Sequence, residues 1–189
     1  GHHYDYAMLT HIASEAPAFG PLINPNDARF LKPGGMPEKI RDFCRETGQR
    51  EPQSHGETIR CALESLACLY RLTLEKMSAV TGRKIKTLHV VGGGIKNELL
   101  QQFTADACGI TVAAGPVEAT SCGNVITQMI ATNQIPGLDA GRELIRRSFD
   151  FRIYQPQDTA AWDKAGWTLF FGGLFIAAWS AYAFETAIC

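Results

Sequence analysis

Residues 86–119 read KTLHVVGGGIKNELLQQFTADACGITVAAGPVEA, and this stretch decides the fold. A short run with β-branched residues at 86–91 leads directly into three glycines. The apolar period then becomes helical over 95–108, Gly109 ends the helix, and 110–114 is a second apolar run. The order predicts two parallel strands joined by a helix, a βαβ unit whose crossover is almost always right-handed.

Helical periodicity also marks the flanking segments. Over 55–80, Ser54 and Glu57 have capping-box spacing and Gly82 is a natural stop. Apolar residues at steps of three and four predict one buried face over about seven turns: Ile59, Leu63, Leu66, Tyr70, Leu74 and Met77. Further helices are expected at 4–16, 37–47, 119–133 and 139–149, with a proline-rich loop before 37. The fold class predicted from these periods is α/β.

Composition excludes several classes of protein. The chain has 189 residues, 46% of them hydrophobic and 20% charged, which is typical of one globular domain and not of a disordered or fibrous chain. With 18 basic and 19 acidic residues, no field that attracts nucleic acid or a membrane surface is indicated. Six cysteines without C-x-x-C spacing indicate reduced thiols, and no secretory signal is visible, so we expect a cytoplasmic protein.

The glycine turn is the candidate ligand site. Without Cβ atoms, Gly92, Gly93 and Gly94 let a flat or charged ligand approach the backbone, and the following helix directs its first N–H groups outward. Asn97, in the predicted first turn, both donates and accepts, which suits a purine edge or a ribose hydroxyl. The alternative is that the glycines only permit tight strand–helix packing.

Two familiar nucleotide motifs do not match. Lys96 stands at the wrong offset for a Walker A loop, and no Ser or Thr follows it. Asn97 replaces the third glycine of a dinucleotide fingerprint, and the second strand does not end in an acid. A nicotinamide cofactor is therefore not expected.

Three blocks resemble the C-terminal half of the FGGY-type carbohydrate kinases, a likeness that covers about residues 4–163. They are INPNDARFLKPGGMPEKIRDFCRETGQ at 23–49, GETIRCALESLACLYRLTLEKM at 56–77 and TLHVVGGGIKNELLQQFTADACGITVAAGPVEATSCGNV at 87–125. The resemblance implies an actin-like (ribonuclease H-like) ATPase lobe over 1–164, with a βαβ core and several packed helices. It also implies that Gly92, Gly93, Gly94 and Asn97 hold ATP, with Gly93 and Asn97 the favoured pair.

The activity that the resemblance implies is ATP-dependent phosphorylation of a ketose, L-rhamnulose, at O1. In the family the catalytic Asp, the sugar contacts and most of the Mg²⁺ site lie in an N-terminal lobe that precedes this sequence. The chain's own aspartates stand in turn, helix-surface or tail contexts, so no catalytic and no metal-ligating residue is assigned: Asp27, Asp42, Asp106, Asp139, Asp150, Asp158 and Asp163. We therefore expect the chain alone to be inactive. The alternatives are a non-catalytic nucleotide- or partner-binding lobe from a truncated gene, or another FGGY sugar kinase.

Other polar residues are interpreted as structural. His89 is expected to be a hydrogen-bonded core residue, and Cys108 and Cys122 to be packing residues without a partnering His. The resemblance implies that the GPVEAT block at 115–120 helps to shape the wall of the site, and Glu118 and Gly123 are expected to be structural.

The end of the chain does not fit the family pattern. Residues 165–184 carry no charge over 20 positions, enough for about 30 Å of helix. Three readings stay open for this apolar tail (165–189): a membrane anchor, a helix buried against a missing lobe or partner, or a lost reading frame near Ala165. Gly172 and Gly173 in mid-segment weaken a stable isolated helix, which disfavours the anchor.

Overall fold

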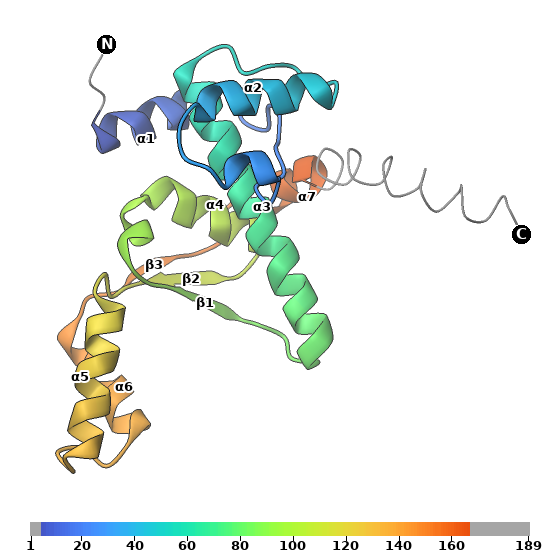
Figure 1. Cartoon of the computed structure of the whole chain (residues 1–189). Coiled ribbons are helices and arrows are strands. Elements are labelled where there is room, and N and C mark those ends of the chain that lie inside the picture. The colour runs from blue at the N-terminus through green and yellow to red at the C-terminus, as the bar shows by residue number, and fades with distance from the viewer. Residues whose placement is uncertain (1–4, 167–189) are drawn as a thin grey trace, which may run out of the picture.

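A three-stranded sheet with the order β1-β2-β3 lies at the centre of the computed structural model, which describes residues 5–166 (Figure 1). β1 (Thr87–Val90) and β2 (Thr111–Ala114) pair in parallel, with Val90 opposite Ala114, and α4 (Glu98–Cys108) connects them. The predicted βαβ unit is therefore confirmed. β3 (Arg152–Tyr154) adds an antiparallel strand beside β2 that the sequence did not predict, because three residues are too few to show alternation.

The predicted helices are present with small shifts at their ends. They are α1 (Tyr6–Glu15), α2 (Met36–Glu46), α3 (His55–Thr81), α5 (Ala119–Ala131) and α6 (Leu138–Ser148). The sequence did not predict α7 (Thr159–Gly166) or the single 3-10 turns η1 (Ala28–Phe30) and η2 (Gly93–Lys96). None of the helices within residues 5–166 combines the length and the hydropathy that a bilayer crossing requires. Residues 167–189, most of the apolar tail, lie outside the described residues.

The ends of α3 follow the sequence signals. Ser54 Oγ accepts a hydrogen bond from the Glu57 N–H at 3.1 Å, and Glu57 Oε2 reaches back to accept from the Gln53 N–H at 3.0 Å. Gly82 takes a left-handed conformation, with φ +66°, and its N–H donates to the Ser78 carbonyl. The Ser54 cap and the glycine stop are confirmed, but Glu57 accepts from the N–H of Gln53 and not from that of Ser54, so the second bond of the capping box is displaced by one residue.

The burial of α3 differs from the prediction. Its first half packs into the main core through Leu63, Ala67 and Cys68, against residues of α1, α4 and α7: Ala13, Phe103, Ala107 and Trp162. The second half projects away from these elements (Figure 1), and Met77 is 50% exposed. The predicted burial over seven turns is wrong for the end of this half, where Met77 and Val80 are exposed, whereas Leu72 still packs against the main core.

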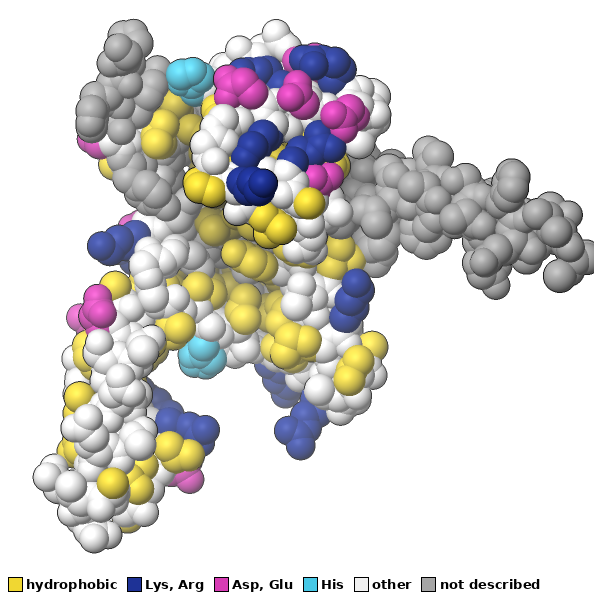
Figure 2. Space-filling view, viewed as in Figure 1, with side chains coloured by type: hydrophobic (Ala, Val, Ile, Leu, Met, Phe, Trp, Pro, Cys, Tyr) yellow, Lys and Arg dark blue, Asp and Glu magenta, His cyan; other side chains and the backbone are white. Residues whose placement is uncertain are grey.

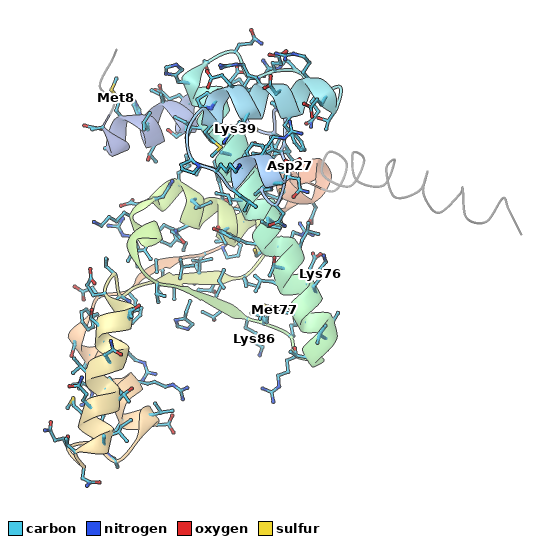
Figure 3. All side chains as sticks on the ribbon, viewed as in Figure 1. Met8, Asp27, Lys39, Lys76, Met77 and Lys86 are labelled. Atoms are coloured by element: carbon cyan, nitrogen blue, oxygen red, sulfur yellow. The ribbon has the colours of Figure 1, made fainter. Side chains whose placement is uncertain are left out.

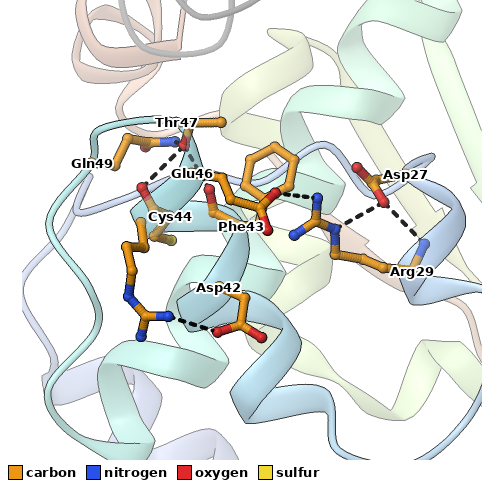
Figure 4. Close-up of polar contacts among 9 residues, drawn as sticks. Asp27, Arg29, Asp42, Phe43, Cys44, Glu46, Thr47 and Gln49 are labelled. Atoms are coloured by element: carbon orange, nitrogen blue, oxygen red, sulfur yellow. Dashed lines mark hydrogen bonds and ion pairs between the residues drawn. The ribbon is translucent and has the colours of Figure 1, made fainter.

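A second small core joins α2 to α3. Ile40 and Cys44 of α2 pack against Cys61 of α3. Beside this cluster, Arg29 links the Asp27 carboxylate, at 3.0 Å, to Glu46 of α2, at 2.6 Å (Figure 4). These contacts hold the proline-rich loop against α2.

A buried ion pair fixes the segment that follows α1. Glu64 of α3 is fully buried, pairs with Arg60 at 2.6 Å and accepts the Phe19 N–H at 3.0 Å. Burial raises the pKa of Glu64, and the hydrogen bonds from Arg60 and Phe19 oppose that rise. The pair is a structural link between the start of the chain and α3.

Candidate functional site

The loops that follow β1 and β2 meet at the carboxyl ends of these parallel strands. The Gly92 N–H donates to the Pro116 carbonyl at 3.2 Å, and the Gly115 N–H donates to the Val90 carbonyl at 2.8 Å. Ligands of open α/β sheets bind in crevices outside the carboxyl ends of strands. The predicted glycine turn therefore stands at the edge of the sheet where a ligand is expected.

The three glycines of the turn are not explained by packing. Gly92 has φ +84°, a conformation that side-chain-bearing residues rarely adopt. Gly93 and Gly94 lack a positive φ, and a Cβ on either would meet no atom within 4 Å. This open space argues against tight strand–helix packing as the reason for Gly93 and Gly94, and it leaves the backbone accessible to a ligand.

The backbone N–H groups of the turn also favour ligand binding. Within residues 5–166, the Gly93 and Gly94 N–H groups donate no hydrogen bond. They stand just ahead of α4, whose N-terminal dipole favours electron-rich ligand atoms. The turn thus presents two unused donors on an open surface.

The structure moves the predicted helix start. Residues 93–96 form the 3-10 turn η2, and α4 begins at Glu98 rather than at residue 95. Asn97 is therefore the N-cap and not a first-turn residue: its Oδ1 accepts the Leu100 N–H at 3.0 Å, and the residue is 8% exposed. Because the oxygen is committed to the cap, Nδ2 is the group of Asn97 that remains for a ligand.

Gln101 is a residue of the site that sequence reasoning missed. It is 2% exposed, and its Nε2 donates to the Gly94 carbonyl at 3.1 Å, which fastens the turn to the first turns of α4. In the sequence, Gln101 is only a polar residue next to the apolar stripe of a predicted helix. That position does not reveal that its side chain bonds to the Gly94 carbonyl.

Two cavities flank the junction of the loops. One, of about 610 Å³, lies between the end of β1 and the α5–α6 pair and is lined by His89, Val91, Pro116, Cys122 and Ile126, among others. The second, of about 740 Å³, lies on the β3 side, beside Ile95, Lys96 and Val117. Both have the size of small-molecule pockets.

Some of the structural predictions need correction at these cavities. His89 is exposed and lines the α5–α6 cavity, so the prediction of a core histidine is wrong. Side chains alternate between the two faces of a strand, and Leu88 and Val90 occupy the face of β1 that packs under α4. His89 therefore lies on the opposite face. Cys122 and Gly123 line the same cavity. Cys108 is partly buried, and burial raises the pKa of its thiol to about 12.

Several of the aspartates have structural partners. Asp27 and Asp158 cap turns, Asp106 accepts the Gln157 N–H, and Asp163 pairs with Arg71. In the part of the chain that the structure describes, no three His, Cys, Asp or Glu side chains converge to hold a metal ion.

Comparison with known proteins supplies the wider context. Residues 2–132 match the FGGY family of carbohydrate kinases, C-terminal domain. A rhamnulokinase of Bacteroides thetaiotaomicron is 48% identical over 160 residues, which are 85% of this chain and 33% of that protein. The rhamnulokinase of Enterococcus faecalis is 49% identical, over 80% of this chain and 31% of its own length. That of Bacillus subtilis is 37% identical, over 82% of this chain and 32% of its own length. The chain thus spans about a third of these relatives.

Solved structures agree on the fold. Xylulose kinase from Rhodospirillum rubrum superposes with a TM-score of 0.63 at 18% identity, over 94% of this chain and 35% of that one. Plasmodium falciparum glycerol kinase with ADP superposes with a TM-score of 0.59 at 20% identity. The match covers 87% of this chain and 33% of that one. The expected α/β lobe of actin-like type is confirmed. The chain belongs to the FGGY family of carbohydrate kinases and carries the C-terminal domain of that family.

Proposed function

We propose that this chain is the nucleotide-binding part of a kinase that transfers a phosphoryl group from ATP to O1 of L-rhamnulose. The observation that carries the proposal is the open turn at Gly93 and Gly94, with two unused amides ahead of α4. The choice of sugar rests on relatives named rhamnulokinase that are 37–49% identical over about 80% of the chain.

In this proposal the turn holds the adenosine part of ATP. The absence of Cβ atoms at Gly93 and Gly94 lets a flat base or a ribose approach the backbone, and the two N–H groups donate to it. Asn97 contributes Nδ2, while its Oδ1 keeps the start of α4 in place. Gln101 fixes the carbonyl of Gly94 and so orients the turn before the nucleotide arrives.

The remaining chemistry is assigned to the part of the kinase that this chain does not span. Phosphoryl transfer needs a carboxylate near the attacking hydroxyl, and Mg²⁺, when bound, neutralises the phosphates. Asp27 and Asp163 are engaged in a cap and an ion pair, and among the described residues no three His, Cys, Asp or Glu side chains converge to hold a metal. We therefore expect the isolated chain to bind ATP without turnover.

Calorimetric titration of the chain with ATP tests the binding step. Gly93→Val fills the open space above the turn and is expected to weaken ATP binding at least tenfold, with an unchanged thermal unfolding midpoint. Ala131→Val, which adds bulk at an exposed end of α5, is the control and should bind as the wild type does. If Gly93→Val binds ATP with wild-type affinity, the turn is not part of the ATP site.

The sugar is tested with a fused enzyme. Joining this chain to the two-thirds of the Bacteroides thetaiotaomicron rhamnulokinase that it does not match gives a fusion of about the length of that protein. We expect that fusion to phosphorylate L-rhamnulose faster than D-xylulose or glycerol, and the isolated chain to release no ADP. Turnover by the isolated chain, or a preference for another sugar, would contradict the corresponding part of the proposal.

A further inference from the structure

The glycine turn has little intrinsic preference for one conformation. Gly92, Gly93 and Gly94 carry no Cβ, and glycine loses more conformational freedom on ordering than any other residue. The turn therefore needs hydrogen bonds from its surroundings to hold its N–H groups in one direction. Without such bonds the ligand would have to order the turn as it binds, and that ordering lowers affinity.

Main-chain hydrogen bonds hold part of the turn. The Gly92 N–H donates to the Pro116 carbonyl at 3.2 Å, which ties the start of the turn to the loop after β2. The Ile95 N–H donates to the Gly92 carbonyl at 3.2 Å. The Asn97 N–H donates to the Gly94 carbonyl, also at 3.2 Å. These bonds depend on the backbone alone, so side-chain substitutions do not remove them.

Gln101 adds a bond from a side chain. Its Nε2 donates to the Gly94 carbonyl at 3.1 Å, beside the bond from the Asn97 N–H. A carbonyl oxygen has two lone pairs, so the two donors together engage both acceptor sites of Gly94. Among residues 5–166, Gln101 supplies the one side-chain hydrogen bond to the main chain of the glycine turn. It is therefore the point at which a side chain controls the turn.

Gln101 is itself held by the core. It is 2% exposed, and it stands on α4, which lies against α3 on one side and against the sheet on the other (Figure 3). Phe103 of α4 packs with Leu63 of α3, and Ala105 of α4 packs with Val112 of β2. A buried amide on a packed helix has few other positions, so its bond to Gly94 joins the turn to the rigid core.

Charged groups take no part in these bonds, which all join uncharged groups. The charged side chains of the face shown in Figure 2 gather most densely over α2, at the top of the view. There they pair with one another, as Arg41 does with Glu38 and Arg45 with Asp42. Salt screens interactions between charges, so the order of the glycine turn should not depend on salt concentration.

We propose that Gln101 is a positioning residue of the nucleotide site. It engages the second lone pair of the Gly94 carbonyl and so restricts the backbone of Gly94 before the ligand binds. The turn then presents the Gly93 and Gly94 N–H groups in one direction, and ATP binds without having to order them. Gln101 acts through Gly94 and does not itself touch the nucleotide. The inference rests on the proposed function only in naming ATP as the ligand.

Gln101→Met tests this role. Methionine has nearly the length and volume of glutamine but cannot donate to the Gly94 carbonyl. The dissociation constant for ATP, measured by calorimetric titration, should rise about tenfold, which corresponds to the cost of fixing the backbone of one residue. The order parameters of the Gly93 and Gly94 N–H groups in the ligand-free chain, measured by ¹⁵N relaxation, should fall from roughly 0.85 towards about 0.6.

Gln102→Met is the matched control. Gln102 is the next residue of α4, and its Nε2 donates to Asp106 Oδ1 and to the Gln155 carbonyl, both at 2.9 Å. The control thus also loses side-chain hydrogen bonds, but on the side of α4 that meets the chain after β3. It should bind ATP and retain the order of the turn as the wild type does. Thermal unfolding checks that both variants are folded at the temperature of the titration.

Two results for ATP binding would overturn the inference. They are wild-type affinity in Gln101→Met, and a loss of affinity equal to that in Gln102→Met. Weaker binding with unchanged order parameters would also overturn it, because Gln101 would then act by contact with the nucleotide. The order parameters are measured without ATP. A wild-type chain that does not bind ATP would therefore contradict the proposed function, while the order parameters would still decide whether Gln101 holds the turn.

Discussion

Gly56 of α3 lies so close to Ile12 of α1 that a Cβ on Gly56 would stand 2.5 Å from the Ile12 carbonyl oxygen. The neighbouring atom belongs to the backbone of a helix and cannot rotate away. α1 and α3 therefore approach each other at a point that only glycine permits, and Ala13 is fully buried beside it.

Gly56→Ala is expected to destabilise the protein by about 1–3 kcal/mol, the usual cost of overpacking a tight contact. The free energy of unfolding, measured with urea, checks this. Gly123→Ala is the matched control, because a Cβ there meets no atom within 4 Å. It should leave stability unchanged or raise it by up to about 1 kcal/mol through helix propensity. Equal effects of the two substitutions would show that α1 does not pack as described.

Asn97 has two separable roles. Asn97→Ser retains an N-cap oxygen but lacks Nδ2, so we expect unchanged stability and weaker ATP binding. Asn97→Ala loses the cap as well and should lower stability by about 1 kcal/mol. Thermal unfolding and calorimetric titration of both variants separate the roles. If Asn97→Ser binds ATP as the wild type does, Asn97 is a capping residue only.

Asp27 gives a pH dependence with a defined sign. The Arg29 N–H, at 2.9 Å, and the Arg29 side chain hold the pKa of Asp27 below its ordinary value. A depressed carboxyl pKa contributes stability that is present at neutral pH and is lost as the pH falls through the folded-state pKa. Asp27→Asn should therefore lower the unfolding midpoint by roughly 2–4 °C at pH 7, and by progressively less below pH 4.

The control for this pH profile is Asp139→Asn, in an exposed ion pair with Arg142. Its midpoint should follow that of the wild type at every pH, because exposed pairs contribute little. A deficit in Asp27→Asn that persisted unchanged to pH 3 would contradict the assigned role of the carboxylate.

Thiol labelling reports on the buried Cys68 and the partly buried Cys108. Burial raises the pKa of Cys68 and of Cys108 to about 12, so at pH 8 only about one thiol in ten thousand is ionised at each site. Iodoacetamide should leave both unmodified in the folded protein and alkylate both in denaturant, as read by mass spectrometry. Modification of Cys68 in the folded state, at the rate seen in denaturant, would contradict its burial in the α3–α4 core.

Much of the fold and part of the site could be predicted where the determinants are local. Ser54 and Glu57 are three residues apart, and Gly82 bonds to Ser78, so the ends of α3 follow from nearest neighbours in the chain. The position of the glycine turn between a strand and a helix is local in the same way. β3 was missed because β2, its partner among residues 5–166, is about forty residues earlier, and nothing within three residues reveals that pairing.

The sequence by itself determined the α/β order, the caps and the presence of a glycine turn, because hydrogen bonds and apolar periods over a few residues define them. Only the tertiary structure decided what surrounds them: that Gly93 faces open space, that Asn97 Oδ1 serves the cap, and that Met77 near the end of α3 is exposed. These properties depend on atoms that are distant in the chain, and a local pattern holds no information about which of those atoms come near.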